Sequence, residues 1–376
     1  MRLTAYSVIV LALLLPSICQ ACLWDSDTLE QERYRFPEVH ELIVGDFVRH
    51  SEAYYRWRIE DRLAKPLEER TPMDYDDIAV SYDKLGQQDK AIEAIHEKIR
   101  RFSSQSVYES EANLGTFLIH AGKLEEGLVH IDKAIEINPD AHFGREIYQK
   151  LLVEYVLHQR AAGAEGLPLA TSDGENFAAF LSDRLDWSVT NRQDETKKAI
   201  TGVLGMMRFG HYDSPILLEA LGDLLMSQGR DANQLAAQAY LRASAMAEER
   251  AAAAAYFSKA GKMLEDQHNM KLKTLQSELV EAVAAADEKF AQIESDESAW
   301  AAAGENVDQK FTSKYYEQPL LRSAQLGLVS FGHWLGQNAW LFGILFVLLA
   351  CMWGIRGMYR WLKADLAEAR ANPPSP

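Results

Sequence analysis

Cysteine is scarce in this chain of 376 residues, which contains only Cys19, Cys22 and Cys351. Two of the three fall in apolar segments near the ends of the sequence, so at most Cys22 remains for a soluble body. A single cysteine cannot form a framework of intrachain disulfides. We therefore expect the body to fold on its hydrophobic residues, which make up 48% of the chain.

Long runs of lysine and arginine are also missing, and the formal net charge is −16 at pH 7. A chain this acidic repels nucleic acids and anionic membrane surfaces unless it carries a local basic patch. We therefore expect no nucleic-acid partner.

The motifs of several common enzyme classes are missing as well. There is no H-E-x-x-H zinc pair, no glycine-rich phosphate loop and no G-x-S-x-G nucleophile elbow. The ten histidines are scattered along the chain. The acidic cluster of Asp74, Asp76 and Asp77 lacks the glycine and the distal Glu of a calcium-binding loop. We therefore expect no metal site, no cofactor and no catalytic residue.

The N-terminal residues have the pattern of a secretory signal. Arg2 gives a basic start, residues 6–15 are apolar except for Ser7, and Pro16 ends the apolar run. This run is too short to span a bilayer, which needs about 20 residues, but it fits the apolar core of a signal peptide. Export of the body is the expectation.

The cleavage position has alternatives. A signal peptidase site fits after Cys19 or after Ala21. Alternatively, Cys22 is a lipidated first residue, as in bacterial lipoproteins, although those usually carry Leu where Cys19 stands. Trp24 lies just beyond, where it either docks on the body or contacts a partner.

A second apolar segment, residues 339–355, contains no charged residue. As a helix it is nearly long enough to cross a hydrocarbon core of about 30 Å. Arg356, Arg360 and Lys363 follow it directly. By the positive-inside rule these residues place the C-terminus in the cytoplasm. We therefore expect a single-pass protein of the cell membrane with an extracytoplasmic, periplasmic body.

Helical periodicity dominates the body. Between residues 30 and 300 apolar side chains recur at spacings of three and four, and strand signals are scarce. One candidate helix pair runs from Pro72 to about Gln105, and a similar unit begins 36 residues after the first, at Tyr108. This pattern predicts an all-α fold that contains internal repeats.

The second unit carries small residues where two helices must approach closely. Leu114 and Gly115 fall on its first helix, Gly122 at the turn, Ala134 on the second helix, and Pro139 closes the unit. This set resembles the tetratricopeptide repeat, whose pattern is W-x2-L-G-x2-Y, then A-x3-F, then P.

Two further units resemble the repeat less closely. The first has Ala79 in place of the glycine and Lys98 in place of the second alanine. A third match begins at Leu221 and Gly222, with a turn at Gly229. The resemblance implies a solenoid of helix pairs whose concave face binds peptides or protein surfaces.

Phe47, Tyr54, Tyr55 and Trp57 would cover the first repeat, although a separate small helical unit also fits these residues. The expected order is a signal peptide (1–21), N-terminal capping helices (22–71), tetratricopeptide-like repeats (72–160), a linker (161–185), a further helical repeat (186–245), a long helical stalk (246–319), an interfacial segment with a transmembrane helix (320–358) and a cytoplasmic tail (359–376).

Two functions from different classes follow. The first is a membrane-anchored scaffold that binds proteins or peptides through the exposed first-helix positions of the repeats. By the repeat register these positions are Asp76, Asp83, Lys84, Thr116, His120, Glu146 and Lys150. The second is an envelope hydrolase built in residues 160–201, where the repeat pattern fails. Its carboxylates would be Asp173, Glu175, Asp183 and Asp186.

Overall fold

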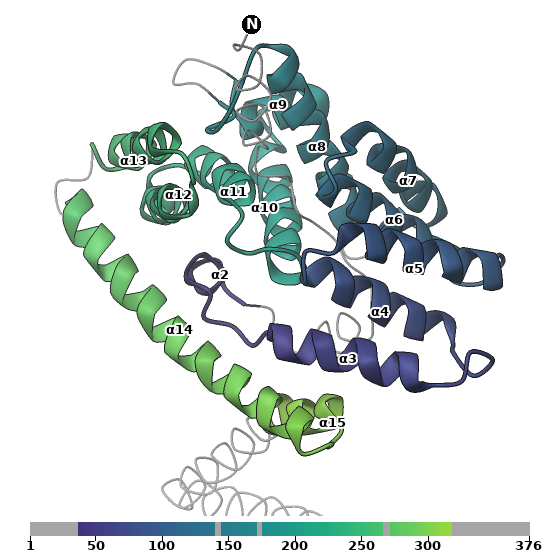
Figure 1. The fold of residues 1–376 in the computed structure, drawn as a ribbon. Coiled ribbons are helices and arrows are strands. Elements are labelled where there is room, and N and C mark those ends of the chain that lie inside the picture. The colour runs from purple at the N-terminus through teal and green to yellow at the C-terminus, as the bar shows by residue number, and fades with distance from the viewer. Residues whose placement is uncertain (1–36, 140–143, 171–174, 266–270, 318–376) are drawn as a thin grey trace, which may run out of the picture. The chain divides into compact units, whose positions relative to one another are not determined.

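The computed structural model describes residues 37–139, 144–170, 175–265 and 271–317 (Figure 1). Within these ranges every regular element is a helix and no strand occurs, which confirms the all-α prediction. The chain divides into two compact units after Val307. Of the second unit, only residues 308–317 are described. They contain most of α15 (Val307–Phe311) and a π-helical turn (Thr312–Glu317).

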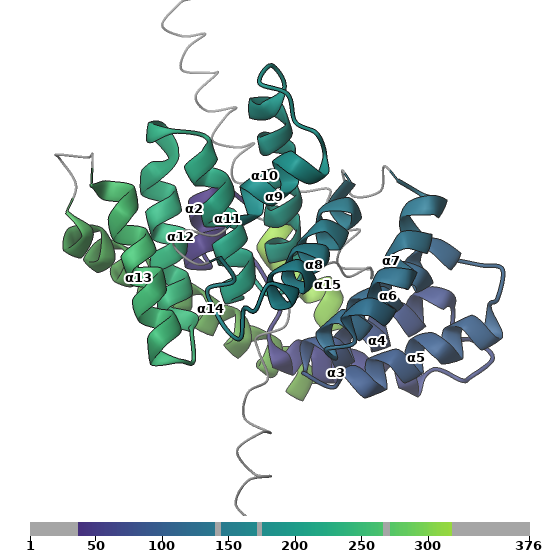
Figure 2. The same ribbon diagram turned by 90° about the horizontal axis from the view of Figure 1, so that it is seen from above.

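The other helices of the described residues lie in the first unit, and most of them pack against their neighbours along the chain. Consecutive contacts run from α3 to α8 and from α10 to α13, and α8 also packs on α10 (Figures 1 and 2). The helices are α2 (Val39–Val44), α3 (Glu52–Ala64), α4 (Pro72–Lys84), α5 (Gln88–Arg101), α6 (Val107–His120), α7 (Leu124–Ile137), α8 (Arg145–Ala161), α9 (Phe177–Arg184), α10 (Arg192–Phe209), α11 (Pro215–Ser227), α12 (Asn233–Met246), α13 (Arg250–Leu264) and α14 (Leu272–Ala302).

The sequence sets the start of the first predicted repeat clearly. The Thr71 side chain accepts a hydrogen bond from the Asp74 backbone N–H, and the Asp74 carboxylate accepts one from the Thr71 N–H. This reciprocal capping box satisfies two N–H groups that a helix start would otherwise leave unpaired. Pro72 follows as the first helical residue, a position where its missing N–H is not needed.

Small residues bring the two helices of a pair together, as the sequence predicts. In α6 and α7, a Cβ placed on Gly115 would lie 2.8 Å from the Ile131 side chain and 3.0 Å from the Gly127 carbonyl oxygen. In α11 and α12, a Cβ on Gly222 would lie 2.6 Å from the Tyr240 ring. The Gly127 backbone at Gly115 and the Tyr240 ring at Gly222 leave no room for a larger residue, which explains the glycines.

The range 161–185, expected as a linker, contains a helix. Asn176 caps the start of α9 by accepting a hydrogen bond from the Ala179 N–H. Phe177 and Leu181, four residues apart, are both fully buried against the main core. One helical turn of apolar spacing was enough to form α9, although the glycine-rich residues before it favoured a loop.

Helix α14 folds back across the stack. It is a single helix of 31 residues that contacts α12 and α13 and also α2 and α3 (Figure 1). It therefore does not stand apart as the stalk expected for 246–319. Helix α2 packs on α10, α12 and α14, whereas α3 packs on α4 at the start of the repeats.

Candidate interaction site

A cavity of about 500 Å³, here called the central hollow, lies where α14 crosses the stack. Its walls come from the segment before α3, the end of α4, the turn between α10 and α11, and the middle of α14. The central hollow is lined by Phe47, Arg49, His50, Glu52, Tyr55, Val80, Lys84, Arg208, Phe209, Gly210, His211, Tyr212, Asp213, Asp287, Phe290 and Glu294.

Arg49 is enclosed by aromatic rings in the central hollow. Its guanidinium carbon lies 3.9 Å from the centre of the Phe290 ring and 4.7 Å from that of Tyr212. The guanidinium also donates hydrogen bonds to the Gly45 carbonyl at 2.5 Å and to the Tyr212 hydroxyl at 3.3 Å. Burial lowers the pKa of Arg49 and raises that of Tyr212. Stacking of this kind stabilises a cation away from bulk water.

Two further cations fix one wall of the central hollow: Lys84 binds the end of α10 and the turn after it, and Arg208 joins α10 to the segment before α3. The Lys84 ammonium donates to the carbonyl oxygens of Phe209 and Gly210 at 2.7 and 2.6 Å. Arg208 donates to the Val48 carbonyl at 2.8 Å. Burial, with Lys84 as a smaller contributor, lowers the pKa of His211 to about 3, so its ring is neutral at pH 7. These contacts give the central hollow a fixed wall.

The α14 side of the central hollow is acidic and open. Asp287 and Glu294 are both exposed, and because they are seven residues apart they lie on the same face of α14. Carboxylates at a mouth and stacked aromatics inside suit the recognition of a polypeptide segment, with polar groups at the rim and large side chains at the centre.

Asp76, one of the predicted groove residues, is instead buried between helices. It is 1% exposed and accepts hydrogen bonds from Lys98 at 2.8 and 2.7 Å and from Asn113 at 3.0 Å. Burial raises the pKa of Asp76 to about 7, although Lys98 acts to lower it. Lys98, fully buried, stands where the repeat pattern has alanine, so this departure from the pattern marks the ion pair.

Four more predicted residues join the first helices of successive pairs. A hydrogen bond of 2.8 Å links Asp83 on α4 to His120 on α6. On the next step, Tyr108 of α6 donates to Glu146 of α8 at 2.9 Å. Nearby, Gln149 donates to Thr116 at 3.1 Å. Asp83, His120, Glu146 and Thr116 are all buried, so they are not the exposed first-helix positions that the register predicted.

Lys84 and Lys150 are the two predicted residues that stay partly exposed. Lys84 binds the carbonyls of the α10–α11 turn and lines the central hollow. Lys150 forms an ion pair of 2.5 Å with Asp132. Contact of the seven predicted residues with a partner stays a prediction.

Sequence reasoning missed a buried acidic pair on α11. Glu219 accepts hydrogen bonds from the N–H groups of Leu169 and Ala170, and from the Tyr256 hydroxyl at 2.7 Å. Asp223 accepts from the Phe177 N–H and from the Tyr240 hydroxyl. Lys259 lies 3.0 Å from Glu219 and 3.4 Å from Asp223. Burial raises the pKa of Glu219.

This acidic pair anchors the chain on both sides of residues 171–174. Polar residues at apolar helix positions were the available signal, because Glu219 and Asp223 interrupt the otherwise apolar α11. Charge-assisted hydrogen bonds to backbone N–H groups explain why a loop here needs buried carboxylates.

The carboxylates of the alternative enzyme lie in different settings. Asp173 falls outside the described residues. Glu175 lies 3.3 Å from His158 Nε2, whereas Asp183 lines a hollow of about 480 Å³ beside Arg192. Asp186 adopts a left-handed conformation, with φ of 48°, in the turn after α9.

Across the described residues, no group of three or more His, Cys, Asp or Glu side chains is placed to hold a metal ion. None of the helices in those same ranges is long and apolar enough to cross a membrane. The predicted signal 1–21, Cys22 and the span 339–355 fall outside them.

Comparison with known proteins gave no match to a family model, to a curated protein or to a solved structure.

A second groove of about 510 Å³, here called the outer groove, runs over α4 between α3 and α5. Its floor comes from the face of α4 opposite to the one in the central hollow: Ile78 and Tyr82 line the outer groove, whereas Val80 and Lys84 line the central hollow. The outer groove is lined by Leu63, Leu67, Arg70, Tyr75, Ile78, Tyr82, Lys90, Glu93, Ala94, Glu97, Arg100 and Arg101.

Proposed function

We propose that this protein is an extracytoplasmic scaffold of the tetratricopeptide-like kind, which binds a protein or peptide partner at the central hollow. The observation that carries the proposal is the aromatic enclosure of Arg49 by Phe290 and Tyr212 in an open cavity. Arginine and aromatic side chains contribute most of the binding energy at protein interfaces, especially in pockets that exclude water.

The arrangement of helices supports the same proposal. Stacked helix pairs expose long surfaces, and solenoids use such surfaces to bind proteins. The polar contacts between α4, α6 and α8 hold the first helices in fixed positions. A rigid wall lowers the entropy cost of binding.

We further propose that residues 339–355 anchor the scaffold in the membrane, with the body outside and the C-terminus in the cytoplasm. The apolar run and the basic residues after it support this orientation. A reporter that is active only outside the cytoplasm should be inactive when fused after Pro376. Activity of that fusion would contradict the orientation.

The scaffold proposal is tested by crosslinking in intact membranes, affinity capture of the protein and mass spectrometry of what it retains. The informative variant is Asp287→Lys with Glu294→Lys, which reverses the charge at the mouth of the central hollow. Both residues are exposed, but Asp287 interacts with the Arg49 cation, so circular dichroism melts must show that the variant is folded before its capture is compared. We expect the specific partner to be captured at least tenfold less than by the unchanged protein.

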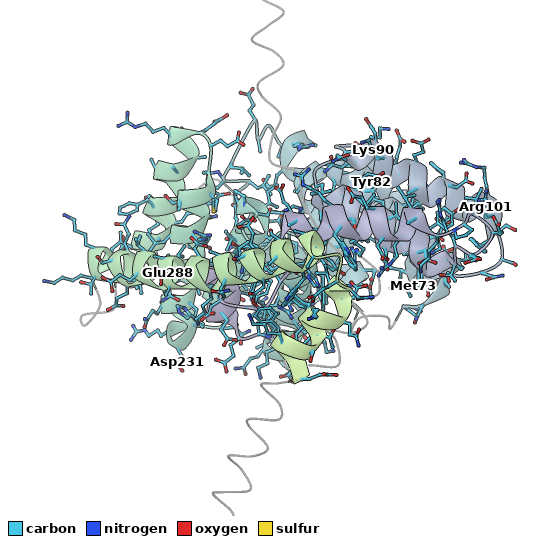
Figure 3. The ribbon with its side chains drawn as sticks, turned by 60° about the horizontal axis from the view of Figure 1, so that its bottom comes forward. Met73, Tyr82, Lys90, Arg101, Asp231 and Glu288 are labelled. Carbon is cyan, nitrogen blue, oxygen red and sulfur yellow. The ribbon has the colours of Figure 1, made fainter. Side chains whose placement is uncertain are left out.

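The matched control is Glu281→Lys with Glu288→Lys. These residues are also exposed on α14 and seven residues apart, but they do not line the central hollow; Figure 3 labels Glu288. The control should retain the partner. Equal loss in both double variants would mean that overall charge governs capture, and equal retention in both would contradict binding at the central hollow.

A further inference from the structure

The outer groove stands out because it is both apolar and basic in an acidic chain. Leu63 and Leu67 are 40% and 45% exposed, although large apolar side chains at the edge of a repeat stack are usually covered. Four cations, Arg70, Lys90, Arg100 and Arg101, line the same groove with two carboxylates. The chain as a whole has a net charge of −16.

The four cations outnumber the two carboxylates, so the groove is positively charged. Glu97 pairs with Arg100 at 2.5 Å and with Arg101 at 2.6 Å, and this cluster of two cations and one carboxylate keeps an excess of positive charge. Lys90 is exposed, and its ammonium lies 5.3 Å from the centre of the Tyr82 ring (Figure 3). An anion approaching Tyr82 therefore meets a cation.

We infer that the outer groove is a second binding site, which takes an acidic segment of a partner protein carrying a large apolar side chain. The apolar side chain would pack between Leu67 and Tyr82, and its flanking carboxylates would meet Lys90 and Arg101. Charge complementarity argues for this occupant, because opposite potentials across an interface select partners and speed their association. The inference rests on the proposed function as a scaffold but uses the opposite face of α4.

The probe is a phage-displayed library of random 12-residue peptides, selected on the purified full chain. We expect the enriched peptides to carry net negative charge and at least one Leu, Phe or Trp. Synthetic copies should bind at least tenfold more weakly to a Lys90→Glu, Arg101→Glu variant. Their affinity for the unchanged chain should fall as salt is raised, because exposed charges are screened.

Leu67→Ser tests the apolar part separately. Leu67 is exposed, so this change leaves the core intact, and it should also weaken the peptides. The matched control is Lys123→Glu with Lys133→Glu, which removes two exposed lysines of the next helix pair. This control should bind the peptides as the unchanged chain does, and circular dichroism melts confirm that each variant is folded.

Several results would overturn the inference: no enrichment, enrichment of neutral or basic peptides, or equal binding by the Lys90 and Arg101 variant. Sedimentation that shows dimers of the unchanged chain and monomers of this variant would also overturn it, because the occupant would then be a second copy. The Asp287 and Glu294 variant separates the two sites. It should keep the selected peptides even though it loses the partner of the central hollow.

Discussion

Replacing Gly115 with alanine tests the helix contact on which the repeat interpretation depends. The change adds one methyl group inside α6, where it would meet Ile131 carbons at 2.8 Å and the Gly127 oxygen at 3.0 Å. Carbon atoms normally lie about 3.5–4.0 Å apart in a packed interior. The Ile131 side chain can rotate, but the Gly127 oxygen belongs to the backbone of α7. The two helices must therefore separate.

Two opposing effects set the magnitude. Overpacking of a dense core costs about 1–3 kcal/mol. Alanine in place of glycine in a helix contributes about 0.5–1 kcal/mol in the favourable direction. We therefore expect Gly115→Ala to lower the free energy of unfolding by up to about 2.5 kcal/mol, and Gly115→Leu to lower it by more.

Gly261→Ala is the matched control, because it makes the same chemical change inside α13. A Cβ on Gly261 would meet only the Leu272 Cδ2 within 4 Å, at 3.5 Å, which is an ordinary contact distance. Helix propensity alone should then act and raise stability by about 0.5–1 kcal/mol. The two glycines are predicted to respond with opposite signs.

Thermal melting of the purified protein, followed by circular dichroism, measures both variants. One kcal/mol corresponds to about 2–4 °C for a folded unit of roughly this size. Gly115→Ala should melt earlier than the unchanged protein, and Gly261→Ala later. A melting temperature for Gly115→Ala raised as much as that of Gly261→Ala would mean that α6 and α7 are not in close contact at this position.

Three further changes test buried polar groups. Acidification to pH 5 should destabilise the protein by up to about 2 kcal/mol through His211, because this side chain binds a proton near pH 6.5 in the unfolded chain but only near pH 3 in the folded protein. Urea unfolding measures this loss of stability. The loss should be smaller in His211→Gln but unchanged in the control His158→Gln, which alters an exposed histidine. Lys98→Met should cost about 3–5 kcal/mol by leaving Asp76 buried without its cation, and adding Asp76→Asn should restore part of the melting temperature. Glu219→Gln should speed hydrogen exchange at the two loop amides that Glu219 binds; unchanged exchange would contradict the anchoring role.

Local features of the fold could be predicted well from the sequence. Apolar spacing and small residues such as Gly115 located the helix pairs, because they report contacts between neighbours along the chain. The central hollow could not be predicted in the same way. It brings Arg49 onto Phe290, and their proximity depends on where α14 folds back. No local periodicity carries that information.

The predicted groove residues show a second kind of limit. The repeat register assigned Asp76 and Thr116 to one face of their helices, but that face meets the next first helix before it meets solvent. The burial of these side chains depends on how tightly successive helix pairs stack, and that is a property of the assembled fold. The lysine at position 98, where the repeat pattern has alanine, was an available signal of the buried pair with Asp76, but the sequence analysis did not predict that pair.

The crossing of α14 also has a consequence for the order in which the chain can fold. In an open solenoid each repeat contacts only its neighbours, so the first pairs can complete their contacts while the rest is still being made. Here the Glu297 carboxylate binds the His50 ring at 2.6 Å and the Ser51 N–H at 2.8 Å, across a separation of 247 residues. At synthesis rates of about 5–20 residues per second, Glu297 is added to the chain roughly 12–50 s after His50. The buried contacts of His50 and Ser51 with Glu297 therefore form only after almost the whole body has been made, and the start of α3 lacks these partners until then.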